Sequence, residues 1–240
     1  MKGSLYFFTL WLAVLNVTPV RAQLNWGLLA GGSLASLYPH QAHGPDPLWE
    51  FNPGTYSWLV TGLAGVAAEE PINRRWSLDA SLLYDGSGAH AVYGFGNLDA
   101  SQTSTLNIRL GYLRLLIQAI YQFNPGHGVR FLAGGGVYAA IGVRGKEKGT
   151  MVSWQGNGGL VTADIDKHLT FANKATENEP FPSTVKPFDA GYTIMGGIEW
   201  SHFRVSPSFS QGFVNLFPGD TFKGKNKSFS LSLVYWIHGG

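Results

Sequence analysis

The chain of 240 residues has no cysteine and few charged residues. Without cysteine it has no disulfide framework, no thiolate zinc site and no acceptor for a lipid anchor. Charged residues make up 13% of the chain, against roughly 25% in ordinary soluble domains. The net charge of +2, with no long basic run, argues against a nucleic-acid partner.

The chain also lacks a long apolar run after residue 22. Gly, Asn, Arg or Gln interrupts each apolar stretch before it reaches the ~18 residues of a transmembrane helix candidate. What the sequence has instead is 32 glycines and 14% aromatic residues. Any membrane span must therefore be made of β-strands.

The first 22 residues are typical of a secretory signal peptide. Lys2 gives a positive start, residues 5–17 are apolar, and a small-residue cleavage pattern ends at Ala22. The apolar run is shorter than the ~20 residues that a spanning helix needs. We predict that residues 1–22 are removed and that residues 23–240 form one exported domain.

Alternation of apolar and polar side chains predicts β-strands along the rest of the chain. It is clearest near the end, where Phe229, Leu231 and Leu233 alternate with Ser230 and Ser232. We expect the two leucines to face lipid and the two serines to face the interior. Eight segments show this period of two: residues 24–36, 55–68, 76–85, 106–123, 129–144, 188–200, 203–213 and 228–237.

Two of these segments contain irregularities. The alternation within residues 106–123 changes phase near Tyr112 and Leu113, which predicts a bulge. Pro207 lies inside residues 203–213 and cannot donate to a strand ladder, which predicts a second bulge.

The connections between the segments alternate in length. Three are short, at residues 69–75, 124–128 and 201–202, and four are long, at residues 37–54, 86–104, 145–187 and 216–226. Outer-membrane barrels have short periplasmic turns and longer external loops. The sequence therefore predicts an all-β protein of the bacterial outer membrane, an eight-stranded antiparallel up-and-down transmembrane β-barrel with residues 145–187 as an exposed outer loop.

Aromatic residues gather at the ends of the predicted strands, as they do at both membrane interfaces. The group expected near the periplasm is Trp26, Trp76, Phe123, Phe131, Trp200, Phe203 and Tyr235. The group expected near the outside is Tyr56, Trp58, Tyr84, Phe188, Tyr192, Phe213 and Phe229. The alternative is a soluble, lipocalin-like periplasmic barrel, whose apolar face turns inward around a ligand.

Two sets of charged residues are candidate sites. An eight-stranded barrel is just wide enough for its side chains, so inward charges should pair and fill the lumen. The predicted lumen set is Asp79, Arg109, Arg114, Arg130, Asp189, Glu199 and Arg204. Two basic clusters are expected at the level of lipopolysaccharide phosphates, namely Arg144, Lys146 and Lys148, and Lys223, Lys225 and Lys227.

Sites for catalysis, cofactors and metals are not apparent. His40 and His43 have the spacing of a metal pair but lack a third ligand. The glycines at 134–136 and 156–159 open no recognisable helix that could hold a phosphate. No serine, histidine and acid arrangement stands out. We expect a protein that is not an enzyme and that uses no metal or cofactor.

Several motifs carry a family resemblance over nearly the whole mature chain. They include Asn25-Trp26-Gly27, Tyr112-Leu113-Arg114, Tyr121-Gln122-Phe123 and residues 211–215, Gln-Gly-Phe-Val-Asn. In these the chain resembles the PorT-like outer-membrane β-barrel proteins of the Bacteroidetes. The resemblance implies a barrel fold and a link to protein secretion, because the founding member serves the type IX secretion system.

The sequence leaves several functions open. The expected role is structural, adhesive or in envelope assembly, with outer-membrane lipid, lipopolysaccharide and envelope or secretion-complex proteins as partners. A narrow transporter for small solutes and a hydrolase at the barrel rim are the alternatives.

Overall fold

The computed structural model describes residues 24–39, 50–96, 100–126, 128–155, 159–174, 183–218 and 224–237. The long strands are β1 (Asn25–Pro39), β3 (Leu59–Pro71), β4 (Trp76–Gly96), β5 (Ala100–Gly126), β6 (Val129–Gln155), β10 (Phe188–Trp200), β11 (Phe203–Gly212) and β12 (Gly224–Trp236). The others are β2 (Glu50–Ser57), β7 (Leu160–His168), β8 (Thr170–Phe171) and β9 (Thr184–Val185). In these ranges no helix is long and apolar enough to cross a membrane.

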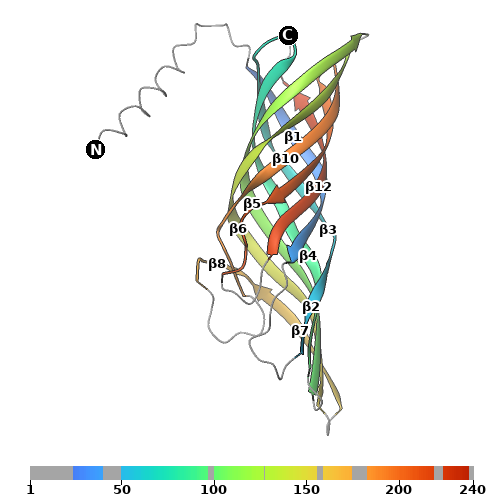
Figure 1. Cartoon of the computed structure of the whole chain (residues 1–240), viewed down its shortest axis with the longest axis vertical. Coiled ribbons are helices and arrows are strands. Elements are labelled where there is room, and N and C mark those ends of the chain that lie inside the picture. Colours follow the sequence, from blue (N-terminus) through green and yellow to red (C-terminus); the bar gives the residue numbers. More distant parts are fainter. Residues whose placement is uncertain are drawn as a thin grey trace, which may run out of the picture.

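Eight of the strands close into a ring, which is drawn in the upper part of Figure 1. They follow the order β1-β3-β4-β5-β6-β10-β11-β12, and β12 pairs with β1 to complete the circle. Every neighbouring pair in the ring is antiparallel. The predicted eight-stranded up-and-down barrel is therefore confirmed.

Both ends of the described chain lie at the same end of the barrel as the short turns. Gly27 is opposite Trp236 at the seam, and Asn25 is opposite Glu69 next to the β3–β4 turn. Barrels of this kind place short turns in the periplasm. We therefore take this end as periplasmic and the opposite end as extracellular. The predicted signal peptide and its cleavage site lie outside the described residues.

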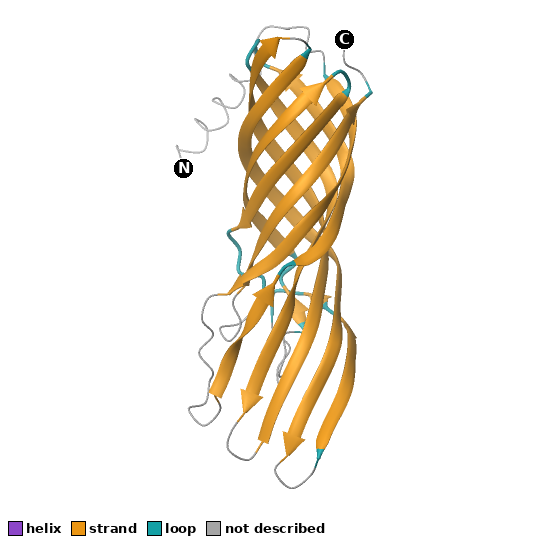
Figure 2. Ribbon diagram, turned by 90° about the vertical axis from the view of Figure 1, so that its right-hand side faces the viewer, coloured by secondary structure: helices purple, strands orange, loops and turns teal. Residues whose placement is uncertain are grey.

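Three strands continue far beyond the barrel at its extracellular end. A transmembrane strand needs only ~9–11 residues, whereas β5 and β6 have 27 each and β4 has 21. Joined by β2 and β7 at the two edges, they form a sheet in the order β2-β4-β5-β6-β7, which flares from the lower end of the barrel in Figure 2. We call this five-stranded region the extracellular sheet.

The extracellular sheet corrects three predictions from the sequence. Residues 86–104 and 145–187 are not long loops, because they contain the outer parts of β4, β5 and β6 together with β7. The predicted strand at 55–68 is two strands, β2 and β3, which part at Trp58. One face of this sheet is rich in Thr, Ser, Lys and Asp, so its alternation looks like that of a polar loop.

The apolar side chains change faces along β5. In the barrel Leu113, Leu115 and Ile117 are exposed on the outside, while in the extracellular sheet Leu106 and Ile108 are buried on the inside. Even-numbered residues of β5 point inward along both regions. The phase change near residue 112 therefore marks a change of surroundings, from lipid to water, and the predicted bulge in β5 is wrong.

A bulge does occur at this level, but in the neighbouring strand. Gly111 is opposite Arg144 and Tyr112 is opposite Gly142, so Val143 is the extra residue on β6. Beside it, Gly88 of β4 has a φ of 128°, and a Cβ there would lie 1.9 Å from the carbonyl oxygen of Ile108. Only glycine tolerates both conditions. These two positions form the junction between barrel and sheet.

Pro207 does not produce the predicted bulge. Its pairing with Leu231 lies in an unbroken β11–β12 register. On its other side the β10–β11 pairing passes from Met195↔Ser208 to Ile198↔Val205 without a shift. The missing N–H of proline thus interrupts one ladder locally and leaves the register of both intact.

Aromatic side chains encircle the barrel near both ends. All seven residues of the predicted periplasmic group are exposed on the outer surface, and several touch, as Phe123 does Phe131 and Phe203 does Tyr235. Six of the seven predicted outer residues are likewise exposed. Tyr56 is the exception, because it packs on the inner face of the extracellular sheet against Tyr93.

The faces of the barrel exclude the soluble alternative. Leu231 and Leu233 are 57% and 45% exposed on the outside, as predicted, whereas Ser206, Ser210 and Arg204 are buried inside. A lipocalin-like barrel would have the opposite arrangement.

An apolar core closes the outer mouth of the barrel. Tyr93, Leu106, Ile108 and Leu110 of the sheet pack in one cluster with Leu37 of β1. Segments that return over the mouth complete the cluster with Leu169, Val185, Leu216 and Phe217. We call this cluster the apolar plug.

Candidate functional site

The periplasmic half of the lumen is built around Arg204, whose side chain is 2% exposed. Its guanidinium forms ion pairs with three carboxylates: Glu69, Asp79 at 3.1 Å and Glu199 at 2.7 Å. These come from β3, β4 and β10, so one cation joins strands on different sides of the ring. The guanidinium also lies 4.7 Å above the ring of Trp236.

Neighbouring polar groups satisfy the same carboxylates. Arg130, near the periplasmic mouth, pairs with Glu199, and the Trp236 indole donates to that carboxylate at 3.3 Å. Gln122 donates to Glu69 at 2.9 Å. Buried ionic groups that are fully paired in this way are tolerated, whereas one left without partners is costly.

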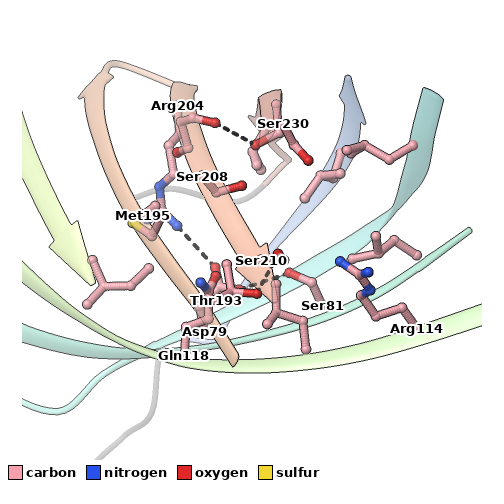
Figure 3. A pocket seen from close by; sticks show the side chains of 18 residues that line it. Asp79, Ser81, Arg114, Gln118, Thr193, Met195, Arg204, Ser208, Ser210 and Ser230 are labelled. Carbon is pink, nitrogen blue, oxygen red and sulfur yellow. Dashed lines mark hydrogen bonds and ion pairs between the residues drawn. The ribbon is translucent and has the colours of Figure 1, made fainter. Parts of the chain in front are cut away.

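A small cavity lies on the extracellular side of this cluster, and Figure 3 shows Asp79, Arg114 and Arg204 among its lining residues. Its volume is about 60 Å³. A water molecule needs ~10–15 Å³ of such volume. The cavity therefore has room for a few water molecules and not for an extended solute.

A second polar cluster lies on the extracellular side of the cavity. Arg114 pairs with Asp85 at 2.6 Å and lies 4.1 Å above the ring of Tyr138. The Tyr138 hydroxyl donates to Asp189 at 3.1 Å, and the Asn226 amide donates to the same carboxylate oxygen at 2.7 Å. Together with the Arg204 cluster and the apolar plug, this gives three successive levels at which side chains fill the lumen.

Most residues of the predicted lumen set lie where the sequence placed them. Asp79, Arg114, Asp189, Glu199 and Arg204 are buried inside the barrel. Arg130 reaches inward from the mouth, with 46% of its side chain exposed.

Arg109 is the exception within the predicted lumen set. It is exposed on the outer face of β5, between the inward-pointing Ile108 and Leu110. The prediction is wrong because the outer part of β5 lies beyond the barrel, where its apolar residues Ile108 and Leu110 face inward. Beyond the extracellular end of the barrel, the outward face of β5 is in water and can carry a charge.

Two acidic residues at the centre of these clusters were missed. The predicted strand ends at residue 68, but β3 continues to Pro71 and buries Glu69 beside Arg204. The sequence could have revealed Glu69, because the odd-numbered residues of β3 point inward, as Leu63 and Ala67 do, and Glu69 is the next odd-numbered residue. Asp85, which pairs with Arg114, ended a predicted strand and had no partner apparent from sequence.

The two predicted basic clusters have different surroundings. Lys146 and Lys148 both pair with Asp166 of β7, at 2.9 and 3.3 Å, which lowers the pKa of that carboxyl group. The Lys227 ammonium nitrogen lies 5.7 Å from the centroid of the Trp58 ring at the outer end of the barrel. Lys223 lies outside the described residues, and Arg144 is exposed beside the β6 bulge.

The inner face of the extracellular sheet also holds a buried tyrosine pair. The hydroxyl groups of Tyr56 and Tyr93 are 2.9 Å apart and share a hydrogen bond. Burial raises the pKa of Tyr93 well above its usual value, and the nearby Tyr56 and Glu147 raise it further. Both groups are therefore neutral at physiological pH.

Metal binding gains no candidate residues from the part of the chain that the structure describes. Within the described residues no group of three or more His, Cys, Asp or Glu side chains is placed to hold a metal ion. His40 and His43 lie outside those residues.

Comparison with known proteins agrees with this geometry. The sequence matches the family described as "Outer membrane protein beta-barrel domain" over residues 18–218. The chain belongs to this family. No curated protein matched the sequence.

Ail, Neisserial surface protein A and OprG are among the solved structures that are similar to the chain. Ail, the attachment invasion locus protein of Yersinia pestis, is 10% identical, with a TM-score of 0.35 over 89% of this chain and 98% of that chain. Neisserial surface protein A is 8% identical, with a TM-score of 0.39 over 88% and 96%. OprG from Pseudomonas aeruginosa is 10% identical, with a TM-score of 0.36 over 89% and 96%. At these identities and scores the likeness says nothing about what this chain does.

Proposed function

We propose that this outer-membrane barrel is a non-conducting anchor that holds the extracellular sheet in place for contact with another surface or envelope protein. One observation carries the proposal: the lumen is filled at three levels while β4, β5 and β6 continue as an ordered sheet outside. The extra length of these strands serves no purpose in crossing the membrane. Their apolar plug fixes the sheet to the barrel mouth.

The edges of the sheet support a role in contact. Among the described residues β2 pairs only with β4, and β7 pairs only with β6. An edge strand leaves backbone N–H and C=O groups free, and a partner strand can add to them. Adhesion and envelope assembly, including assembly of a complex that secretes proteins, both use such a surface. We propose a role of this class, without catalysis.

Conductance separates this role from that of a small-solute transporter. The purified protein, inserted in planar lipid bilayers, is expected to give no discrete current steps. An open porin of known conductance serves as the insertion control for the same preparation. Regular steps from the wild-type protein would overturn the proposal in favour of a channel.

Crosslinking in living cells tests the contact role. A photoreactive residue at Thr162 of β7 should capture a protein in a discrete adduct, because this strand is at the sheet edge. The same residue at Leu231 faces lipid and should capture none. Failure to form an adduct at Thr162 and at its neighbours 160–166, when the protein is at the surface, would contradict a partner at this edge.

A further inference from the structure

A cavity of about 500 Å³ lies where β3 parts from β4 at the outer end of the barrel. The β3–β4 pairing ends at Leu63↔Asp85, and β4 next pairs with β2 from His90 onward. Across the gap the Thr61 hydroxyl donates to the Gly86 carbonyl at 2.9 Å. The cavity is lined by residues on both faces of the wall, and its outward-facing side contains Gly62, Tyr84, Arg109, Gly111, Arg144 and Lys146.

Two glycines, Gly62 and Gly111, and the ring of Tyr84 line this cavity. A Cβ on Gly111 would lie 2.2 Å from the Tyr84 hydroxyl, so the tyrosine ring lies directly against this glycine. Gly62 is exposed, and a Cβ there would meet only the Gly31 carbonyl at 3.7 Å. A larger side chain at residue 62 would occupy the hollow without disturbing the strands around it.

The rim of the cavity is cationic. Arg144 is opposite Gly111, and Lys146 is opposite Arg109, so three basic residues on β5 and β6 lie in adjacent positions of one ladder. Arg109 and Arg144 are exposed, and neither forms an ion pair with any residue that the structure describes. Lys146 shares Asp166 with Lys148. The rim therefore carries an excess of positive charge.

Below the rim the same wall is apolar and faces lipid. Ile141 and Val143 of β6 and Leu113 and Leu115 of β5 are exposed there. A ligand that fits the whole surface has a phosphate group at one end, a compact polar unit and then acyl chains. Guanidinium groups bind phosphate through paired, charge-assisted hydrogen bonds.

We propose that this cavity binds the phosphate-bearing headgroup of a lipid of the outer leaflet. Arg109 and Arg144 hold the phosphate, the hollow over Gly62 takes the adjoining sugar or glycerol unit, and the acyl chains lie along Leu113 and Ile141. The site keeps Arg144 and Lys146 from the predicted basic cluster, adds Arg109, and leaves Lys148 outside the cavity. It does not depend on the proposed contact role of the sheet.

The test uses the whole protein in phosphatidylcholine nanodiscs that contain a small fraction of phosphorylated lipid A. Native mass spectrometry measures how much lipid A stays bound, with dephosphorylated lipid A and free inorganic phosphate as the two further probes. The wild-type protein should retain phosphorylated lipid A, lose most binding to the dephosphorylated form, and keep the lipid when free phosphate is added. Displacement by equimolar phosphate would mean an ion site and would overturn the assignment to lipid.

Three variants test the cavity itself. Arg109→Gln with Arg144→Gln should weaken retention about tenfold or more, because two charge-assisted phosphate contacts are lost. The control, Lys148→Gln with Lys225→Gln, removes the same charge elsewhere and should bind as the wild type does. Gly62→Leu leaves every charge in place but fills the hollow, and it should also weaken binding.

The Gly62→Leu variant keeps the proposal testable if the arginine variant does not fold. Folding of each variant is checked by the difference in gel migration between heated and unheated samples. Wild-type retention by a folded Gly62→Leu protein would show that the hollow is not the site. Equal losses in the arginine pair and in the lysine control would mean general attraction to anionic lipid, which also overturns the proposal.

Discussion

The barrel and the extracellular sheet share β4, β5 and β6, yet they place apolar side chains on opposite faces. In the barrel Leu113, Leu115 and Ile117 point outward, and in the sheet Leu106 and Ile108 point inward. The backbone alternation of β5 is the same in both regions. The surroundings therefore decide the pattern: lipid outside the barrel selects apolar residues, and water outside the sheet selects polar ones.

The two regions also differ in how their interiors are held together. The barrel interior depends on ion pairs around Arg204 and Arg114, whereas the inner face of the sheet is held by apolar contacts within the plug. Ion pairs and hydrogen bonds join particular groups on opposite walls of the barrel. The plug stabilises the sheet by burying apolar surface, which does not depend on the orientation of the groups. The predictions below test this difference, from the largest expected effect to the smallest.

Replacing Arg204 should have the largest effect. Arg204→Leu leaves Glu69, Asp79 and Glu199 buried together without their shared cation. Breaking a buried pair from one side typically costs about 3–5 kcal/mol. The free energy of unfolding, measured with denaturant in lipid vesicles, should fall by that amount. Arg74→Leu, in the exposed β3–β4 turn, is the control and should change it by less than about 0.5 kcal/mol. Equal effects would mean that the lumen cluster does not stabilise the barrel.

Truncating Leu106 should weaken the sheet alone. Leu106 is fully buried in the plug, and a Leu→Ala change in a core costs about 2–5 kcal/mol. Protease added to whole cells should cut the extracellular sheet faster in Leu106→Ala, while the barrel keeps its heat-dependent gel migration. Thr105→Ala, one residue away on the outer face, should leave the cutting rate unchanged. Loss of the barrel in the Leu106 variant would show that the two regions unfold as one.

Arginine at two outward positions of β5 should locate the edge of the lipid. Ile117→Arg puts a charge on the lipid-facing wall, where it costs about 2–4 kcal/mol near the midplane. Thr105→Arg puts the same charge on the outer face of the sheet, and we expect almost no cost. The free energy of unfolding of each variant is measured with denaturant in lipid vesicles. A similar cost at residue 105 would mean that lipid covers the sheet as well.

The sheet should also weaken at high pH through Tyr93. Its pKa is raised when folded, chiefly by burial and then by Tyr56, so folding favours the neutral form. The contribution of Tyr93 to the free energy of unfolding is complete below about pH 10, the pKa of tyrosine in the unfolded chain. It is lost as the pH rises beyond that value. Protease cutting of the sheet should increase above pH ~10 in the wild type. Tyr93→Phe should show a smaller increase, and an equal one would assign the effect to another group.

The sequence predicted the barrel well because lipid imposes a strict rule on it. Alternation located all eight membrane strands, and Leu231 and Ser232 face as expected. The aromatic belts followed for the same reason, apart from Tyr56. The lumen residues Arg114, Asp189 and Arg204 could be found because they are charged residues on the face opposite the apolar, lipid-facing residues of their strands.

The rest depends on contacts that no local pattern encodes. The sheet has one face in water and the other in the apolar plug. The plug also includes Leu169 and Val185 from the stretch between β6 and β10, and Phe217 from the connection after β11. The inverted pattern of the sheet therefore looked like a bulge on β5 and like loops on β4 and β6. Glu69 was not predicted as a lumen residue because the predicted strand ends at residue 68, three residues before the end of β3. The pairing of Arg114 with Asp85 needs the β4–β5 register, which periodicity does not give.

The inversion along β5 can be measured directly with single cysteines, since the native chain has none. Intact cells carrying Cys at residue 105, 108, 117 or 118 are treated with a water-soluble maleimide or with one dissolved in the membrane. The account predicts that residue 105 reacts with the water-soluble reagent, residue 117 only with the membrane-dissolved one, and residues 108 and 118 with neither. Reaction of residue 117 with the water-soluble reagent, or of residue 108 in place of 105, would contradict a single strand that passes from lipid to water with its faces unchanged.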